Sequence, residues 1–275
     1  MQHAPADRPS PVPAARTLLG AALAAVLALT ATACAGGGRG TDRPAGPVPP
    51  TVRSPAAHPS PALPPALTRG QARAALVTAD DLGEAWEPTR GAATWRDELL
   101  KATAGRPDCR RLLDVLYTED LFGADAATAP RATAALDDAD GGAQLHYRVT
   151  SYRAADLDRT LDWLGTLPDA CGHFEARAAA HGATRDVRVT ELALPDAGDA
   201  RRGLRVTVGD AAPDGGADTR GETLTVDLVA VRVGDDAISL TNGTLGEPPD
   251  DATRTAVEAG TGRLTEARRQ GRAQV

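Results

Sequence analysis

The sequence predicts an α+β fold, in which helices cover an antiparallel sheet within one domain. Two observations favour this class. Segments in which apolar and polar residues alternate follow one another with short polar turns between them, as in hairpin-linked strands. Segments with helical spacing lie before, between and after these strands, and this order favours helices that cover an antiparallel sheet.

Residues 1–33 have the organisation of a lipoprotein signal peptide. Arg8 and Arg16 supply positive charge, and an apolar segment of thirteen residues runs from Leu18 to Thr30. Small residues then lead into Cys34, and this stretch resembles the lipobox of bacterial prolipoproteins. The resemblance implies cleavage before Cys34, a lipid (palmitate or a similar acyl chain) on this residue, and attachment to the outer face of the cytoplasmic membrane.

Two other interpretations of the leader remain open. The uncharged stretch from Thr17 to Gly38 is long enough in principle for an uncleaved membrane-spanning helix. Cleavage without lipid attachment would instead release the protein, but it would give Cys34 no role. The next segment, residues 34–67, has nine prolines between positions 35 and 67 and is expected to be a disordered spacer.

The domain is expected to span residues 68–275 and to begin with helices. Thr68 and Gln71 form the S/T-x-x-Q pattern of a capping box, which predicts a helix through Val77 and a turn at 80–83. A second helix is predicted over 94–104. A third is predicted over 109–116, with Asp108 as its cap.

The pattern then changes to strands, interrupted by one helix. Strands are predicted over 131–136 and 143–152, followed by a helix over 154–167 that Pro168 ends. Further strands are predicted over 174–180, 186–194, 203–208, 222–233 and 237–241. The spacing of apolar residues predicts a closing helix over 250–269.

Charge and cysteine content restrict the possible partners. The formal charge of the chain is −7, and without the leader it is about −8, so nucleic acid is not an expected partner. Of the three cysteines, Cys34 belongs to the cleavage site, which leaves Cys109 and Cys171. In an exported protein this pair predicts a disulfide, whereas two free buried thiols would suit a cytosolic protein better.

The folded part contains no recognised catalytic or cofactor motif, so we expect no enzyme activity and no cofactor. No pair of cysteines or histidines has zinc-site spacing, and the acidic run 137–140 departs from a calcium loop at its first ligand position. Candidate residues for a ligand-binding cleft are large or charged groups within segments of small residues: Trp86, Tyr147, Tyr152 and Arg232.

Several motifs in this order resemble the extracellular sensor domain of actinobacterial receptor Ser/Thr kinases of the PknH type, which also occurs in lipoproteins. They are Leu76–Gly83 leading to Trp86, Pro107–Cys109 opening a helix, Cys171 after a helix, and Asp227–Gly234 before a hairpin. The resemblance covers nearly all of 68–275. It implies a twisted antiparallel sheet, a cleft and a sensing role with no established ligand.

The leading functional hypothesis is therefore a membrane-anchored extracytoplasmic sensor or ligand-binding domain. The second is a cell-envelope scaffold that binds a protein partner. The third is a hydrolase whose catalytic residues are not recognisable. An apolar cleft with a few polar groups would favour ligand binding, and a flat apolar patch would favour a protein partner.

Overall fold

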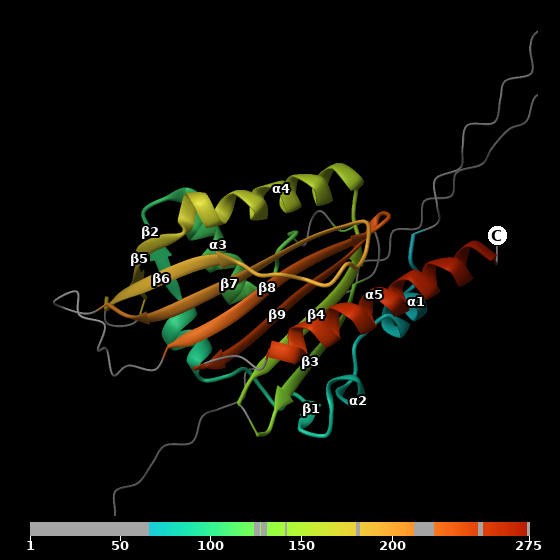
Figure 1. Cartoon of the computed structure of the whole chain (residues 1–275), viewed down its shortest axis with the longest axis horizontal. Helices are drawn as coiled ribbons and strands as arrows, with labels where there is room; N and C mark the ends of the chain where they lie inside the picture. Colours follow the sequence, from blue (N-terminus) through green and yellow to red (C-terminus); the bar gives the residue numbers. More distant parts are fainter. Residues whose placement is uncertain are drawn as a thin grey trace, which may run out of the picture. The chain divides into compact units, whose positions relative to one another are not determined.

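A single nine-stranded antiparallel sheet forms the centre of the domain in the computed structural model (Figure 1), with the strand order β1-β3-β4-β9-β8-β7-β6-β5-β2. The structure describes residues 66–123, 127, 131–140, 142–179, 182–211, 223–246 and 250–273. The predicted signal peptide and nearly all of the predicted linker lie outside these residues. The strands are β1 (Trp86–Pro88), β2 (Ala102–Ala104), β3 (Ala132–Asp138), β4 (Gln144–Ser151), β5 (His173–Ala178), β6 (Thr184–Glu191), β7 (Ala200–Asp210), β8 (Leu224–Val233) and β9 (Asp236–Leu245).

The helices pack on both faces of this sheet, which confirms the predicted α+β class. They are α1 (Arg69–Ala74), α2 (Ala79–Leu82), α3 (Pro107–Thr118), α4 (Ala154–Cys171) and α5 (Asp250–Ala273), with a short π-helix at Arg96–Leu100. In Figure 1, α5 lies in front of the strands and α3 lies behind them. Among the described residues, no helix has both the length and the hydrophobicity needed to cross a membrane.

The two helical layers cover different parts of the sheet. Alternate residues of β5, β6, β7 and β8 form one apolar core with α3 and α4. A second apolar core joins α1 and α5 to β3, β4, β8 and β9 on the opposite face. Strand β8 therefore belongs to both cores, and every residue from Leu224 to Val233 except Arg232 is buried. A strand buried on both faces is expected at the centre of a sheet that is covered on both sides.

Close packing seats α5 directly on strand β4. Gly260 of α5 faces the ring of Tyr147, and a Cβ atom placed on Gly260 would lie 1.9 Å from the Tyr147 hydroxyl oxygen. Glycine is needed here because any side chain would occupy the same space. Charged pairs add to this layer: Arg263 of α5 contacts Asp81 at 2.6 Å, and Arg268 contacts the buried carboxylate of Asp236.

The first helix is shorter than predicted, and the predicted turn at 80–83 is helical. Helix α1 ends at Ala74, and the capping box between Thr68 and Gln71 is present as predicted. The Asp81 side chain accepts hydrogen bonds from the backbone and hydroxyl of Thr78, which begins the short helix α2. The same pattern of Thr, Asp and Gly suits a turn or a single helical turn, so the local sequence does not distinguish them.

The predicted helix over 94–104 is wrong. Residues 96–100 form the π-helix, and 102–104 form strand β2, which pairs with β5 at the edge of the sheet. Here tertiary pairing overrides the helical preference of the sequence, because Leu99, Leu100 and Ala104 are all buried in the α3/α4 core.

The bounds of the two disulfide-bearing helices also differ from the prediction, except that α4 begins at Ala154 as predicted. Helix α3 begins at Pro107 after the cap residue Arg106, two residues before the predicted start. Proline suits this first position because its missing N–H would have no partner there. Helix α4 contains Pro168 and continues to Cys171. Leu167 and Cys171 are fully buried, and this burial holds the last turn in place despite the hydrogen bond that proline removes.

Candidate functional site

A pocket lies on the α3 side of strands β3, β4 and β9. Helices α3 and α4 leave this part of the sheet uncovered. It has a volume of about 210 Å³ and is closed on one side by residues from the end of α3. Its lining residues are Val115, Glu119, Leu121, Thr133, Ala134, Ala135, His146, Tyr147, Arg148, Leu228, Ser239, Leu240 and Thr241. Strand alternation places the side chains of His146, Arg148, Ser239 and Thr241 on this face of the sheet, away from α5.

Strand register brings the polar side chains together across the pocket floor. His146 of β4 is paired with Thr241 of β9, and Arg148 is paired with Ser239. Directly opposite residues of neighbouring strands lie on the same face, so these four side chains form one polar group. Ser239 and Thr241 are each 8% exposed. No hydrogen bond of either hydroxyl to another residue is found within the described part of the chain.

The end of α3 supplies the carboxylate that faces His146. Glu119 caps this helix in the left-handed conformation, with φ of 55°, and it is the one non-glycine residue with positive φ in the described ranges. This conformation is uncommon for glutamate and costs free energy. Here it reverses the chain after Thr118 and brings Glu119 between Arg96 and His146.

Charge pairs hold the polar groups around the pocket. The Nδ1 atom of His146 lies 2.9 Å from a Glu119 oxygen, and the other oxygen of Glu119 contacts Arg96. The Nη1 atom of Arg148 lies 2.8 Å from the carboxylate of Asp120. Each of these five side chains is less than one third exposed, so the pairs are only partly screened by solvent.

Gln144 anchors the other side of the His146 ring. Its Oε1 atom lies 3.0 Å from Nε2 of His146 and also accepts a hydrogen bond from the backbone of Ala93. Its Nε2 atom donates to Gly91 and Asp137 at 2.9 and 2.8 Å. Gln144 is only 4% exposed, so the imidazole is held in place by a buried and fully bonded amide.

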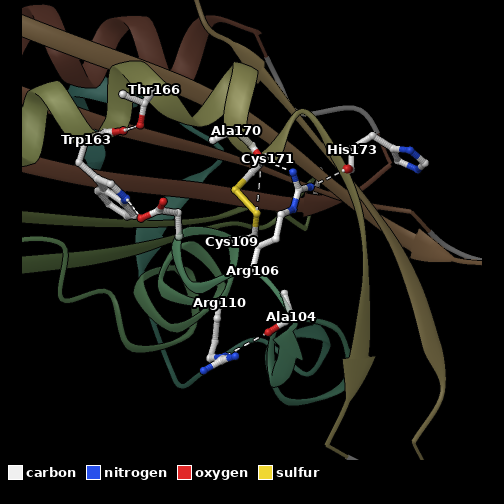
Figure 2. Close-up of a disulfide and its surroundings, with 10 residues drawn as sticks. Ala104, Arg106, Cys109, Arg110, Trp163, Thr166, Ala170, Cys171 and His173 are labelled. Atoms are coloured by element: carbon white, nitrogen blue, oxygen red, sulfur yellow. Dashed lines mark hydrogen bonds between the residues drawn. A yellow bond between two sulfur atoms is a disulfide. The ribbon is translucent and has the colours of Figure 1, made fainter.

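The predicted disulfide between Cys109 and Cys171 is present. Figure 2 shows it joining α3 to α4, with the hydrogen bond from Trp163 of α4 to Asp108 of α3 beside it. Arg106 strengthens the same junction by donating to the carbonyl of His173 at 2.9 Å. The bond lies near the start of α3, whereas the pocket lies at the end of this helix. It therefore fixes the element that carries Glu119 and does not take part in the pocket itself.

The four cleft residues proposed from sequence are not brought together. Trp86 lies on the edge strand β1 and is 8% exposed in the α5 core. Tyr147 contributes to the pocket floor, but its ring packs against α5, and burial raises the pKa of its hydroxyl well above the ordinary value. Tyr152 packs on Phe122 with 4.8 Å between ring centres, and Arg232 pairs with Asp158. A ligand-binding role for these residues stays a prediction, and Cys34 lies outside the described residues.

Sequence reasoning missed Glu119, His146, Arg148, Ser239 and Thr241 as a group. One signal was available, since β4 alternates polar Gln144, His146 and Arg148 with apolar Leu145, Tyr147 and Val149. That pattern is also typical of an ordinary solvent-facing strand. The distinguishing facts are the burial of the polar side and its pairing with β9, which depend on the tertiary structure.

Comparison with known proteins finds solved structures of similar fold, and the extracellular domain of PknH is among them. The crystal structure of the extracellular domain of PknH from Mycobacterium tuberculosis superposes with a TM-score of 0.45 and 9% sequence identity, over 75% of this chain and 99% of that chain. A likeness at this level assigns neither a family nor a function. No family model matches the sequence, and no curated protein matches it. Within the described ranges, no group of three or more metal-binding side chains occurs.

Proposed function

We propose that this protein is a membrane-anchored extracytoplasmic lipoprotein whose domain binds a small ligand in the pocket between β3, β4, β9 and α3, without catalysing a reaction on it. The observation that carries the proposal is the pocket floor. Ser239 and Thr241 present hydroxyls that bond to no other residue within the described part of the chain, beside the partly bonded guanidinium of Arg148. These groups face the pocket, so a ligand that bonds to them takes the place of water there.

The composition of the pocket supports small-molecule binding over a protein scaffold. Apolar side chains of Val115, Leu121 and Leu228 line it together with a few convergent polar groups, which is the usual character of a ligand site. The hollow shape distinguishes it from the flat apolar patch that a protein partner would require.

Mass spectrometry of the full-length protein, purified under native conditions, tests ligand binding. We expect a small molecule to be retained by the wild type and lost in Ala135→Trp, because Ala135 lines the pocket and a large side chain would fill it. The matched control is Thr190→Trp on the exposed face of β6, which should keep the molecule. No retained molecule, or equal retention by both variants, would contradict a ligand site here. A co-purifying protein lost only in Ala135→Trp would favour the scaffold.

Metabolic labelling with radioactive palmitate tests the membrane anchor. The sequence around Cys34 predicts that the wild type carries label, and that Cys34→Ser accumulates as an unprocessed precursor without it. Normal processing of the Cys34→Ser variant would reject the lipoprotein assignment. It would leave the pocket's function unaffected, because Cys34 lies outside the domain.

A further inference from the structure

The pocket has more hydrogen-bond donors available than acceptors. Arg148 carries five N–H groups, and one of its nitrogens, Nη1, bonds to Asp120. No further hydrogen bond of this guanidinium is found within the described ranges. The hydroxyls of Ser239 and Thr241 lie on the neighbouring strand at the paired positions, and each of them can also donate. A ligand in the pocket therefore meets several donors from β4 and β9.

The acceptors of the same site are already bonded. One oxygen of Glu119 contacts Arg96 and the other contacts His146. The second nitrogen of His146 faces Oε1 of Gln144, so both ring nitrogens lie against acceptors. A ligand therefore finds the carboxylates of Glu119 and Asp120 already paired with protein groups.

One wall of the pocket is apolar and limits what can bind. Val115 and Leu121 come from α3 and the segment after it, and Leu228 comes from β8. The volume of about 210 Å³ exceeds the roughly 150 Å³ of an engineered protein cavity that holds benzene. The site thus has room for a short hydrocarbon group and one polar group. It is too small for a lipid with long acyl chains or for a folded peptide segment.

We propose that the pocket binds a small organic carboxylate. Its anionic group bonds to Arg148 and to the hydroxyls of Ser239 and Thr241, and its hydrocarbon part lies on Val115, Leu121 and Leu228. This inference rests on the proposed ligand-binding function and names the chemical class of the ligand. A guanidinium suits this role because its planar N–H groups match the geometry of a carboxylate.

Isothermal titration calorimetry of the full-length protein tests this proposal with three probes of different chemistry. Hexanoate has both the charge and the hydrocarbon chain, hexanamide lacks the charge, and inorganic phosphate lacks the chain. We expect hexanoate to bind at least about ten times more tightly than either of the others, as a charge-assisted hydrogen bond predicts. Arg148→Gln should weaken hexanoate binding about ten- to a hundredfold and leave hexanamide binding unchanged.

Two further variants separate binding from folding. Arg188→Gln changes an exposed arginine of β6 that does not line the pocket, and it should leave hexanoate binding as in the wild type. Arg148→Lys keeps the charge without the planar N–H groups, and we expect it to bind hexanoate more tightly than Arg148→Gln does.

Three outcomes would overturn the carboxylate assignment. They are hexanamide binding as tightly as hexanoate, phosphate binding as tightly as hexanoate, and an absence of hexanoate binding to the wild type. None of these removes the proposed ligand-binding function if the natively purified protein still retains a molecule that Ala135→Trp loses. Absence of both hexanoate binding and a retained molecule would reject the two proposals together.

Discussion

The two sides of strands β4 and β9 differ in a way that separates stability from binding. On the side of α5, the apolar residues Leu145, Tyr147 and Val149 are almost fully buried, and Gly260 leaves no space above the tyrosine ring. On the side of α3, the same strands place His146, Arg148, Ser239 and Thr241 around a pocket. A sheet can perform both tasks because successive side chains point to opposite faces. Substitutions on the α5 side should therefore change folding, and those on the α3 side should change binding.

The largest effect is expected from removal of the disulfide that fixes α3. The bond joins residues separated by 62 positions, and the chain-entropy model predicts a loss of about 4 kcal/mol in the free energy of unfolding for a loop of this length. The variant Cys109→Ala/Cys171→Ala avoids a free thiol, and urea unfolding measures the change. Reduced wild-type protein is the control and should unfold at a similar urea concentration. A loss below about 1 kcal/mol would show that packing alone holds α3 on the sheet.

A smaller loss is expected on the α5 side from Gly260→Ala. The added Cβ would lie within 3 Å of the hydroxyl oxygen and two ring atoms of the buried Tyr147, so helix and strand must move apart. Overpacking of this kind costs about 1–3 kcal/mol. The matched control is Gly262→Ala, where no atom lies within 4 Å of the new Cβ. Because alanine favours a helix, this control should raise stability by about 0.5–1 kcal/mol in the same unfolding assay. Equal effects of the two substitutions would contradict the close packing of α5.

Part of the fold could be predicted from the sequence alone. The strands from 131 onward, the closing helix and the Cys109–Cys171 pair follow from alternation, apolar spacing and cysteine parity, which are local or countable properties. The segment 94–104 could not be predicted, because its conversion to a π-helix and strand β2 depends on pairing with β5. The pocket was not predictable for a similar reason. Glu119 reaches His146 only through a left-handed residue and a contact between segments 27 positions apart.

A pH dependence is expected from the pair that ties α2 to α5. Burial acts to raise the pKa of Asp81, but hydrogen bonds from the Thr78 backbone and hydroxyl and from Arg263 outweigh it, and the pKa lies below 3.8. The stability from this group is therefore present above pH 3.8 and is lost as the pH falls through the lowered value. Urea unfolding between pH 2 and 6 should show a weaker acid dependence in Asp81→Asn than in the wild type. An unchanged dependence would mean that Asp81 does not stabilise the α2–α5 contact.

The smallest effect is expected from Tyr147→Phe. The tyrosine hydroxyl is buried without a hydrogen-bond partner among the described residues, so its removal abolishes an unsatisfied polar group. We expect a change in the free energy of unfolding between zero and about 1 kcal/mol in the stabilising direction, and no change in hexanoate affinity. A loss of affinity in this variant would show that Tyr147 acts in the pocket as well as in the α5 core.

Chemical-shift mapping by NMR tests whether the α3 side of β3, β4 and β9 is the ligand site. Isotope-labelled full-length protein is titrated with hexanoate, and the backbone amide shifts are followed. We expect the largest changes at five residues that surround the pocket: Glu119, His146, Arg148, Ser239 and Thr241. Changes concentrated on α5 or on β5–β7, or no changes at saturating hexanoate, would contradict a ligand site on the α3 side of these strands.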